Sequence, residues 1–370
     1  MLNFSFNLPT KVIHGTEVVS KNAAEIAKFG RKAFLVTGKS SARLSGALAD
    51  VEATLNSLGI EYKIFDQVLN NPTLDNVAAG GKQAREYQPD FIIAIGGGSP
   101  LDAAKAVAVL AVNDIEPQEL YTNDFAVMPL PIIAIPTTAG TGSEVTPYSV
   151  LTLEDLETKK SFSTQDLFPK IAFLDWRYTA SLSRTVTIDT AVDALSHLVE
   201  GYLSRRANDT SDLFAKRGIK LWGECIEALV KDRIDGEIRD KLLVASLLGG
   251  FTISHTGTTF VHALGYPLTY FQDLPHGRAN GLVIGQALKF TQTVAPERVR
   301  NVLTLLGLES LDQLIELLNK LFPEEYTLTK EEARKYAART AQNKNVQQSL
   351  GEVTEEVLYS ILKTSFTLVD

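Results

Sequence analysis

Four residues in the second half of the sequence have side chains that could bind a divalent metal ion. Asp193 and His197 are four positions apart in a segment with helical periodicity, so both side chains would lie on one face of a helix. His262 lies in another helical stretch, and His276 follows fourteen residues later at a predicted junction between a loop and a helix. One carboxylate and three imidazoles are a complete ligand set for Fe²⁺ or Zn²⁺. Taken singly, each histidine also fits an ordinary hydrogen bond, and spacing alone does not show that the four converge.

Three consecutive glycines, residues 96–98, separate an apolar run from a helical segment. We expect Ser99 to cap that helix and Asp102 to complete a capping box three residues later. Glycine lets the backbone approach a ligand closely, and helix N–H groups favour an anion, so the loop predicts a diphosphate cradle. A tight turn that needs positive φ is the alternative. The segment is not the usual GxGxxG fingerprint, because Leu101 replaces the third glycine and the loop follows a later strand.

A polar loop follows the first predicted strand and consists of Gly38, Lys39, Ser40 and Ser41. A site selective for NAD usually has a carboxylate here that holds the ribose 2′-hydroxyl. This loop offers a cation and two hydroxyls instead, which favours the 2′-phosphate of NADP. A solvated turn would have the same composition.

A loop rich in hydroxyl groups follows the run PIIAI and contains Thr137, Thr138, Thr141 and Ser143. Hydroxyls at the carboxyl end of a strand suit contacts to ribose and carboxamide groups, although a surface hairpin could have the same residues.

The elements that would position these loops change character along the chain. Near-continuous apolar runs alternate with helical segments up to about Trp176, which indicates a parallel sheet covered on both faces. From about Ser183 only helical periodicity is found, which predicts an all-helical domain. We therefore expect an α/β dinucleotide-binding domain over residues 1–180, Rossmann-like but non-standard, and a helical metal-binding domain over residues 181–370. The predicted strands are Ala33–Thr37, Glu61–Phe65, Phe91–Ile95 and Pro131–Ile135, and the helices between them include Ala47–Leu58 and Asn76–Tyr87.

Composition excludes several classes of protein. The 370 residues are 45% hydrophobic and carry a formal net charge of −8, which argues against a dedicated nucleic-acid surface. The single cysteine, Cys225, excludes a disulfide framework and is expected to be an ordinary buried residue. No apolar run is long enough for a membrane helix, and the first residues lack the features of a signal peptide. We expect a cytoplasmic protein with no membrane or nucleic-acid partner.

Four motifs taken together and in order, GGGSPLDAAK, PTTAGTGSE, DALSHLVEGY and HALGYPL…PHGRAN, resemble those of the iron-dependent (group III) alcohol dehydrogenases. The resemblance spans nearly the whole chain and implies a dehydroquinate synthase-like fold. It also implies that Asp193, His197, His262 and His276 bind the catalytic metal, which would be Fe²⁺ or, as the alternative, Zn²⁺. One departure is Tyr266, which stands where many members have a second histidine, so a proton relay at that position would differ.

The resemblance further assigns the cofactor site. Gly38 falls where members that prefer NAD carry aspartate, which agrees with the preference for NADP(H) over NAD(H) inferred from the loop. Ser40 and Ser41 are added to the site because they are the polar residues that follow Gly38. The complete set of expected cofactor-binding residues is Gly38, Ser40, Ser41, Asn71, Gly97, Gly98, Ser99, Asp102, Thr137, Thr138, Thr141, Ser143 and Lys159.

The implied activity is hydride transfer between a small primary alcohol or diol, or the corresponding aldehyde, and the nicotinamide, in the cleft between the domains. The metal would lower the pKa of the alcohol. A homodimer is expected because dimers are common in the family.

Two alternatives have the same fold: an NAD-linked enzyme similar to glycerol dehydrogenase and an enzyme similar to dehydroquinate synthase. The alternative from another class is a metallohydrolase or a metal-binding protein without redox activity. We expect His14 and His255 to be structural or surface residues.

Overall fold

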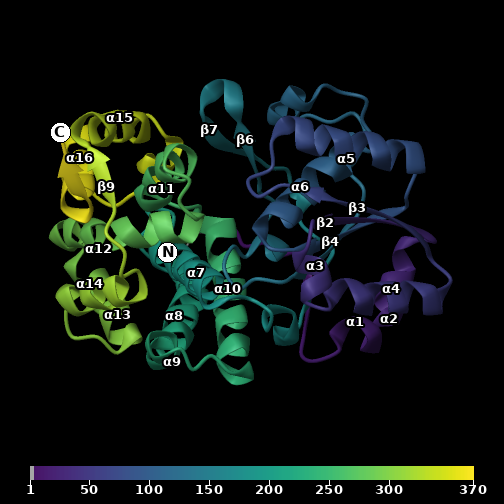
Figure 1. The fold of residues 1–370 in the computed structure, drawn as a ribbon, viewed down its shortest axis with the longest axis horizontal. Helices are drawn as coiled ribbons and strands as arrows, with labels where there is room; N and C mark the ends of the chain where they lie inside the picture. Colours follow the sequence, from purple (N-terminus) through teal and green to yellow (C-terminus); the bar gives the residue numbers. More distant parts are fainter. Residues whose placement is uncertain (1–3) are drawn as a thin grey trace. The chain divides into compact units, whose positions relative to one another are not determined.

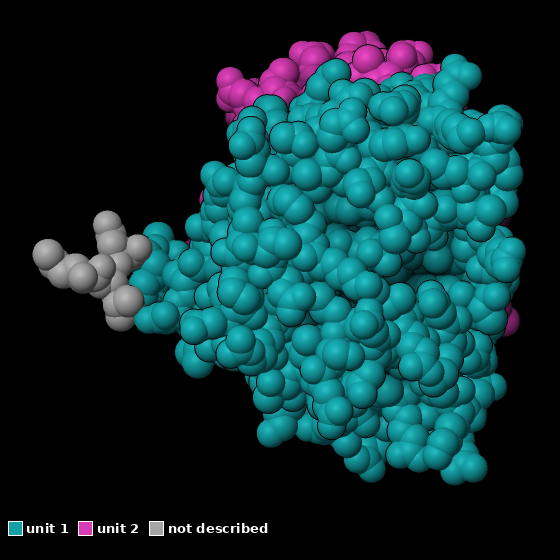
Figure 2. All heavy atoms as spheres, turned by 90° about the vertical axis from the view of Figure 1, so that its left-hand side faces the viewer, with its two compact units in different colours: residues 1–6, 183–370 teal, residues 7–182 magenta. Residues whose placement is uncertain are grey.

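The structure is a computed structural model that describes residues 4–370, and the chain forms two compact units, coloured separately in Figure 2. Asn7–Leu182 form the α/β unit, and residues 183–370 together with residues 4–6 form the helical unit. No helix within residues 4–370 combines the length and the apolar character needed to cross a lipid bilayer.

The α/β unit is built on a six-stranded sheet in which all neighbouring strands are parallel, in the order β1-β8-β5-β4-β2-β3. The four predicted strands are β2, β3, β4 and β5, and they are neighbours in this sheet. The predicted parallel sheet is therefore confirmed for these four strands. The two strands that the sequence did not predict, β1 and β8, pair at one edge. The strands are β1 (Lys11–His14), β2 (Lys32–Gly38), β3 (Glu61–Val68), β4 (Phe91–Gly96), β5 (Ile132–Pro136) and β8 (Ile171–Leu174).

Alternate residues of each strand enter two separate cores, one on each face of the sheet. Phe34 and Val36 of β2 pack with residues of α5 and α6, while Ala33 and Leu35 pack with residues of α1, α2 and α4. Figure 1 shows these two layers of helices with the strands between them. The helices of this unit are α1 (Val18–Lys21), α2 (Ala23–Ile26), α3 (Ser41–Leu44), α4 (Ala47–Leu58), α5 (Leu74–Tyr87) and α6 (Gly98–Leu110), and an antiparallel hairpin is formed by β6 (Ser149–Leu153) and β7 (Thr158–Phe162).

The start of α6 differs from the prediction. The helix begins at Gly98, and the capping position is Gly97, which has no side-chain cap. The Ser99 hydroxyl instead accepts a hydrogen bond from the Asn71 N–H at 3.3 Å. The predicted capping box is therefore wrong, because both side chains that would form it bond to other segments.

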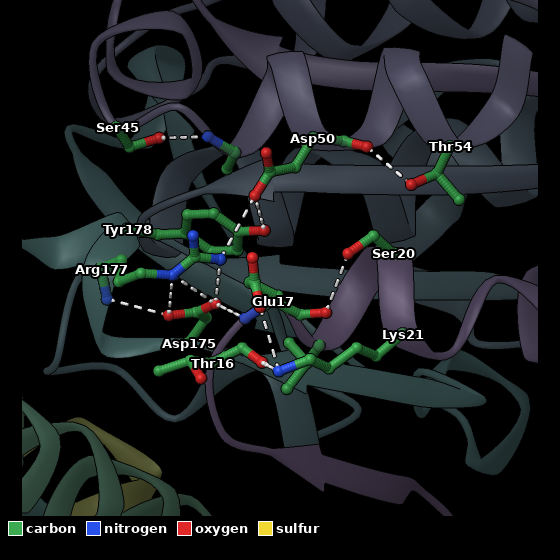
Figure 3. Close-up of polar contacts among 12 residues, drawn as sticks. Thr16, Glu17, Ser20, Lys21, Ser45, Asp50, Thr54, Asp175, Arg177 and Tyr178 are labelled. Carbon is green, nitrogen blue, oxygen red and sulfur yellow. Dashed lines mark hydrogen bonds and ion pairs between the residues drawn. The ribbon is translucent and has the colours of Figure 1, made fainter. Parts of the chain in front are cut away.

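A polar network closes the carboxyl end of β8 (Figure 3). The buried Asp175 carboxylate accepts hydrogen bonds from the Glu17 N–H at 2.6 Å and from Arg177 Nε at 3.0 Å. The hydroxyl of Tyr178 donates to Asp50 on α4 at 2.8 Å. These contacts join the segment after β1 and helix α4 to the end of the sheet, so the Asp175 carboxylate has a structural role.

The helical unit is organised around α7, which packs against α8, α10 and α12 and is buried over nearly all of its length. Its N-terminus is fixed by the Ser183 hydroxyl, which accepts from the Val186 N–H. The helices are α7 (Arg184–Tyr202), α8 (Asp209–Gly223), α9 (Ile226–Lys231), α10 (Gly236–Thr256), α11 (Phe260–Phe271), α12 (His276–Val294), α13 (Pro296–Leu306), α14 (Leu311–Leu321), α15 (Lys330–Ala341) and α16 (Glu355–Ser365).

The predominantly helical character of this unit agrees with the prediction, with one addition. Two strands of three residues, β9 (Thr327–Thr329) and β10 (Thr367–Val369), form a parallel pair. Strands this short have too few residues for an alternating pattern to be recognised in the sequence.

Candidate functional site

Helix α7 positions two of the four predicted metal ligands. Asp193 and His197 lie one turn apart and are 3% and 6% exposed. His262 belongs to α11 and is also buried, and His276 is the first residue of α12. Helix α7 and the two consecutive helices α11 and α12 therefore contribute side chains to one cluster, in which Asp193, His197 and His262 are buried and His276 is partly exposed.

The ligand atoms of this cluster are close enough to share one ion. One ligand atom each from Asp193, His262 and His276 lie within 4.8 Å of one another. The Nε2 atoms of His197 and His262 are 2.9 Å apart, and the two rings stack with their centroids at 4.5 Å. The structure thus brings all four predicted residues together, with His197 joined to the group through His262.

The charges in the cluster favour an anionic carboxylate. Burial alone would raise the pKa of Asp193, but the imidazoles of His197, His276 and His262 and a hydrogen bond from Asn280 lower it below its ordinary value. Burial would lower the pKa of His262, and the carboxylate of Glu200 reverses that effect, so the pKa of His262 is raised. A metal ion bound here would therefore compete with a proton on His262, and it would find the carboxylate of Asp193 already ionised.

The donor set and its spacing fit a divalent transition metal. Two nitrogens that bind one ion at about 2.1 Å and a right angle are separated by about 3 Å, which is close to the spacing of the two Nε2 atoms. Three imidazoles and one carboxylate suit Fe²⁺ and Zn²⁺. Two glycines beside the ligands lie where no larger residue would fit. A Cβ at Gly265 would overlap Asn280 Oδ1, and a Cβ at Gly277 would overlap the Asp189 carbonyl oxygen.

Sequence reasoning missed two residues that support this cluster, Glu200 and Asn280, and gave Tyr266 only as a departure from the family. The Glu200 carboxylate contacts Nδ1 of His262, and Asn280 Nδ2 donates to Asp193 Oδ1 at 3.1 Å. The ring of Tyr266 stacks on His276 with the centroids 5.7 Å apart. A signal for Glu200 existed, because it follows His197 by three positions and so shares its helix face.

The glycine-rich loop and the threonine loop, both in the α/β unit, lie side by side. The Thr137 N–H donates to the Gly96 carbonyl at 2.9 Å. A Cβ at Gly97 would be 3.1 Å from Thr138 Cγ2, and one at Gly98 would be 2.7 Å from Thr141 Cγ2. Close packing between the loops therefore accounts for these glycines even before any ligand is considered. The threonine loop is largely buried, so it is not the surface hairpin that the sequence left open.

A buried lysine fixes this pair of loops. Lys105 is fully buried on α6, and its Nζ donates to Ser143 Oγ at 2.6 Å, to the Ser143 carbonyl at 3.0 Å and to the Tyr148 carbonyl at 2.7 Å. Asp102 accepts from Ser143 Oγ and from the Val150 N–H. Burial raises the pKa of Asp102 and lowers that of Lys105, although each partner opposes the shift of the other. Both oxygens of Asp102 thus bond to the protein.

The remaining predicted cofactor residues form two groups. Lys159 on β7 donates to Asn71 Oδ1 at 2.6 Å, and Asn71 lies in a left-handed conformation beside Ser99. Gly38 ends β2, and a Cβ there would be 3.5 Å from Ser41 Oγ, an ordinary van der Waals distance. Ser40 precedes the short helix α3 in the same turn.

The other histidines and the cysteine are not members of this cluster. His14 is an exposed residue at the end of β1, and His255 stacks on Phe6 with the ring centroids 4.3 Å apart. Cys225 is buried, which raises the pKa of its thiol to about 12 and makes it a poor nucleophile.

Two family models match the chain. Residues 9–176 match the model described as iron-containing alcohol dehydrogenase, and residues 187–366 match the C-terminal model of the Fe-containing alcohol dehydrogenase family.

Individual relatives agree with these models. The chain is 33% identical to alcohol dehydrogenase 4 of Saccharomyces cerevisiae (strain YJM789) over 281 residues, 75% of this chain and 73% of the relative. It is 30% identical to an NADPH-dependent butanol dehydrogenase of Clostridium saccharobutylicum over 328 residues, 85% and 83% of the two chains. The crystal structure of an iron-containing alcohol dehydrogenase from Thermotoga maritima superimposes with a TM-score of 0.92 at 39% identity, covering 98% of this chain and 99% of that one. The chain therefore belongs to the iron-containing alcohol dehydrogenase family.

Proposed function

We propose that the protein is a metal-dependent, NADP(H)-linked alcohol dehydrogenase and aldehyde reductase for small primary alcohols or diols. The observation that carries this proposal is the largely buried cluster of Asp193, His197, His262 and His276, whose donor atoms suit one divalent metal. The names of two relatives, an NADPH-dependent butanol dehydrogenase and a 1,3-propanediol dehydrogenase, support the choice of substrates.

The chain's own residues would divide the work between holding the metal and holding the nucleotide. Fe²⁺, or Zn²⁺ in its place, would supply Lewis acidity that lowers the pKa of an alcohol or polarises an aldehyde. Asp193 contributes the negative charge, and the imidazoles of His197, His262 and His276 contribute neutral donors. The glycine-rich and threonine loops offer backbone N–H groups and hydroxyls to the dinucleotide, and Lys159 offers a cation next to Asn71.

The first test is oxidation of butanol and 1,3-propanediol by the purified protein under anaerobic conditions, after loading with Fe²⁺ or Zn²⁺ and with NADP⁺ and NAD⁺ compared in parallel. We expect turnover that requires the metal and is faster with NADP⁺. Turnover with NAD⁺ alone would favour an enzyme similar to glycerol dehydrogenase. Tight metal binding with no NADPH binding would favour the metallohydrolase or the non-redox metal protein.

Gly38→Asp should reverse the cofactor preference. The new carboxylate would repel a 2′-phosphate and could accept a hydrogen bond from the ribose 2′-hydroxyl of NAD, and the surroundings of Gly38 leave room for a Cβ. We expect the ratio of kcat/KM for NADP⁺ to that for NAD⁺ to fall by about 10–100-fold, the effect of one charge-assisted contact. Steady-state kinetics with both cofactors measure this ratio.

The control for this variant is Asn56→Asp, which adds the same charge at an exposed position on α4. It should leave the ratio unchanged. A Gly38→Asp enzyme that keeps the wild-type ratio would show that this position does not read the 2′-phosphate.

A further inference from the structure

Glu200 is a buried carboxylate that contacts one proposed metal ligand, His262, and the nearby Thr259. It lies on α7, one turn beyond His197, and is 2% exposed. Its Oε2 contacts Nδ1 of His262. Its Oε1 accepts hydrogen bonds from the Thr259 N–H at 2.8 Å, from Thr259 Oγ1 at 2.6 Å and from the His262 N–H at 3.2 Å.

These contacts determine which nitrogen of His262 carries a proton. An ionised carboxylate only accepts hydrogen bonds, so the neutral imidazole beside it must place its proton on Nδ1. Three donors, the Thr259 N–H, the Thr259 hydroxyl and the His262 N–H, already face Oε1 of Glu200, and hydrogen bonds of this kind favour the ionised carboxylate. The unprotonated nitrogen is then Nε2, which lies 3.7 Å from Asp193 Oδ1 and 2.9 Å from Nε2 of His197.

We propose that Glu200 is a positioning residue that holds His262 in the Nδ1–H tautomer, with its Nε2 lone pair directed at the metal. This inference rests on the proposed metal-dependent function of the same cluster. Partners of this kind typically change metal affinity by about 10–100-fold when they are removed.

An amide at this position could not replace the carboxylate. In Glu200→Gln, one of the two terminal atoms of the side chain becomes an NH₂ group, which only donates. If NH₂ faces Thr259, it opposes two N–H groups and leaves them without an acceptor. If it faces His262, it donates to Nδ1 and moves the imidazole proton to Nε2, where a metal ligand cannot carry it. Either arrangement weakens the site while the volume of the side chain hardly changes.

The test combines a tautomer measurement with metal affinity in Glu200→Gln. The chain has only five histidines, so the spectrum of the ¹⁵N-histidine-labelled protein is simple. The ring nitrogen signals of His262 can be assigned because they are absent from the spectrum of His262→Asn. In the metal-free wild type at alkaline pH we expect the proton on Nδ1, and in Glu200→Gln a shift of population towards Nε2–H. Zn²⁺ affinity, measured by competition with a chelator, should fall by about 10–100-fold.

The matched control is Asp212→Asn, which removes the same charge from another buried carboxylate of the helical unit. Asp212 bonds to Arg298 at 2.7 Å and not to a proposed ligand. We expect its Zn²⁺ affinity to stay within twofold of the wild type. If Glu200→Gln does not fold, as judged by circular dichroism, Glu200→Asp keeps the charge but shortens the reach, and it should show an intermediate loss of affinity.

The outcomes separate this inference from the proposed function. An Nε2–H tautomer in the metal-free wild type, or unchanged Zn²⁺ affinity in Glu200→Gln, would overturn the role of Glu200. A wild-type protein that binds no Zn²⁺ and no Fe²⁺ but keeps His262 as Nδ1–H would instead overturn the metal-dependent function.

Discussion

Replacing His197 with alanine is expected to lower kcat/KM by about 10³-fold or more and to leave NADPH binding within twofold. His197 is one of the imidazoles in the cluster, and its Nε2 lies 2.9 Å from that of His262, so its loss leaves an incomplete ligand set. Because the metal's contribution to the transition state is worth several kcal/mol, a weakened site should lose most of the rate. Metal content by elemental analysis, kcat/KM and NADPH fluorescence titration measure the three effects.

His255→Ala is the matched control for this variant. It removes a histidine from the same unit, but one that stacks on Phe6 outside the cluster. Its metal content and kcat/KM should remain close to those of the wild type. Full activity in His197→Ala would remove His197 from the metal site.

Lys105→Met should produce the largest loss of stability among these variants. The lysine is fully buried and supplies hydrogen bonds to three oxygens beside Asp102, so its removal leaves a buried carboxylate without its cation. Breaking a buried ion pair typically costs about 3–5 kcal/mol. We expect the free energy of unfolding of the α/β unit, measured by urea denaturation of the metal-free protein, to fall by that amount.

The double variant Lys105→Met/Asp102→Asn tests the reason for that loss. In the double variant the charge of Asp102 is no longer left without its cation, so the double variant should be more stable than Lys105→Met alone. A loss below about 1 kcal/mol in Lys105→Met would show that the pair is not the element that fixes the two loops.

The sequence predicted those features that depend on a local pattern. The apolar runs of β2, β4 and β5 are long enough to indicate buried parallel strands, and the spacing of Asp193 and His197 predicts a shared helix face. Convergence with His262 and His276 came from the family resemblance, because the packing of α7, α11 and α12 is not encoded in any local spacing.

Features that depend on contacts between distant segments could not be predicted in this way. Glu200 is recognisable as a partner only once α11 places His262 beside it. Asp102 has the spacing of a capping box, yet Ser143 and Lys105, brought close by tertiary packing, bind its carboxylate instead. The strand β8 has four residues and pairs with β1, which is far away in sequence, so neither strand gives a strong pattern.

All four proposed metal ligands belong to the helical unit, and all the proposed nucleotide contacts belong to the α/β unit. No residue in these two sets would therefore bind both the metal and the dinucleotide. In the absence of substrate, any cooperativity between metal and dinucleotide must be transmitted through the protein or through the charges of the two ligands. Thermodynamic linkage requires that coupling to be reciprocal: a metal that tightens NADPH binding by a given factor is itself bound more tightly by the same factor when NADPH is present. Metal retention during purification would then depend on whether the nucleotide is in the buffer.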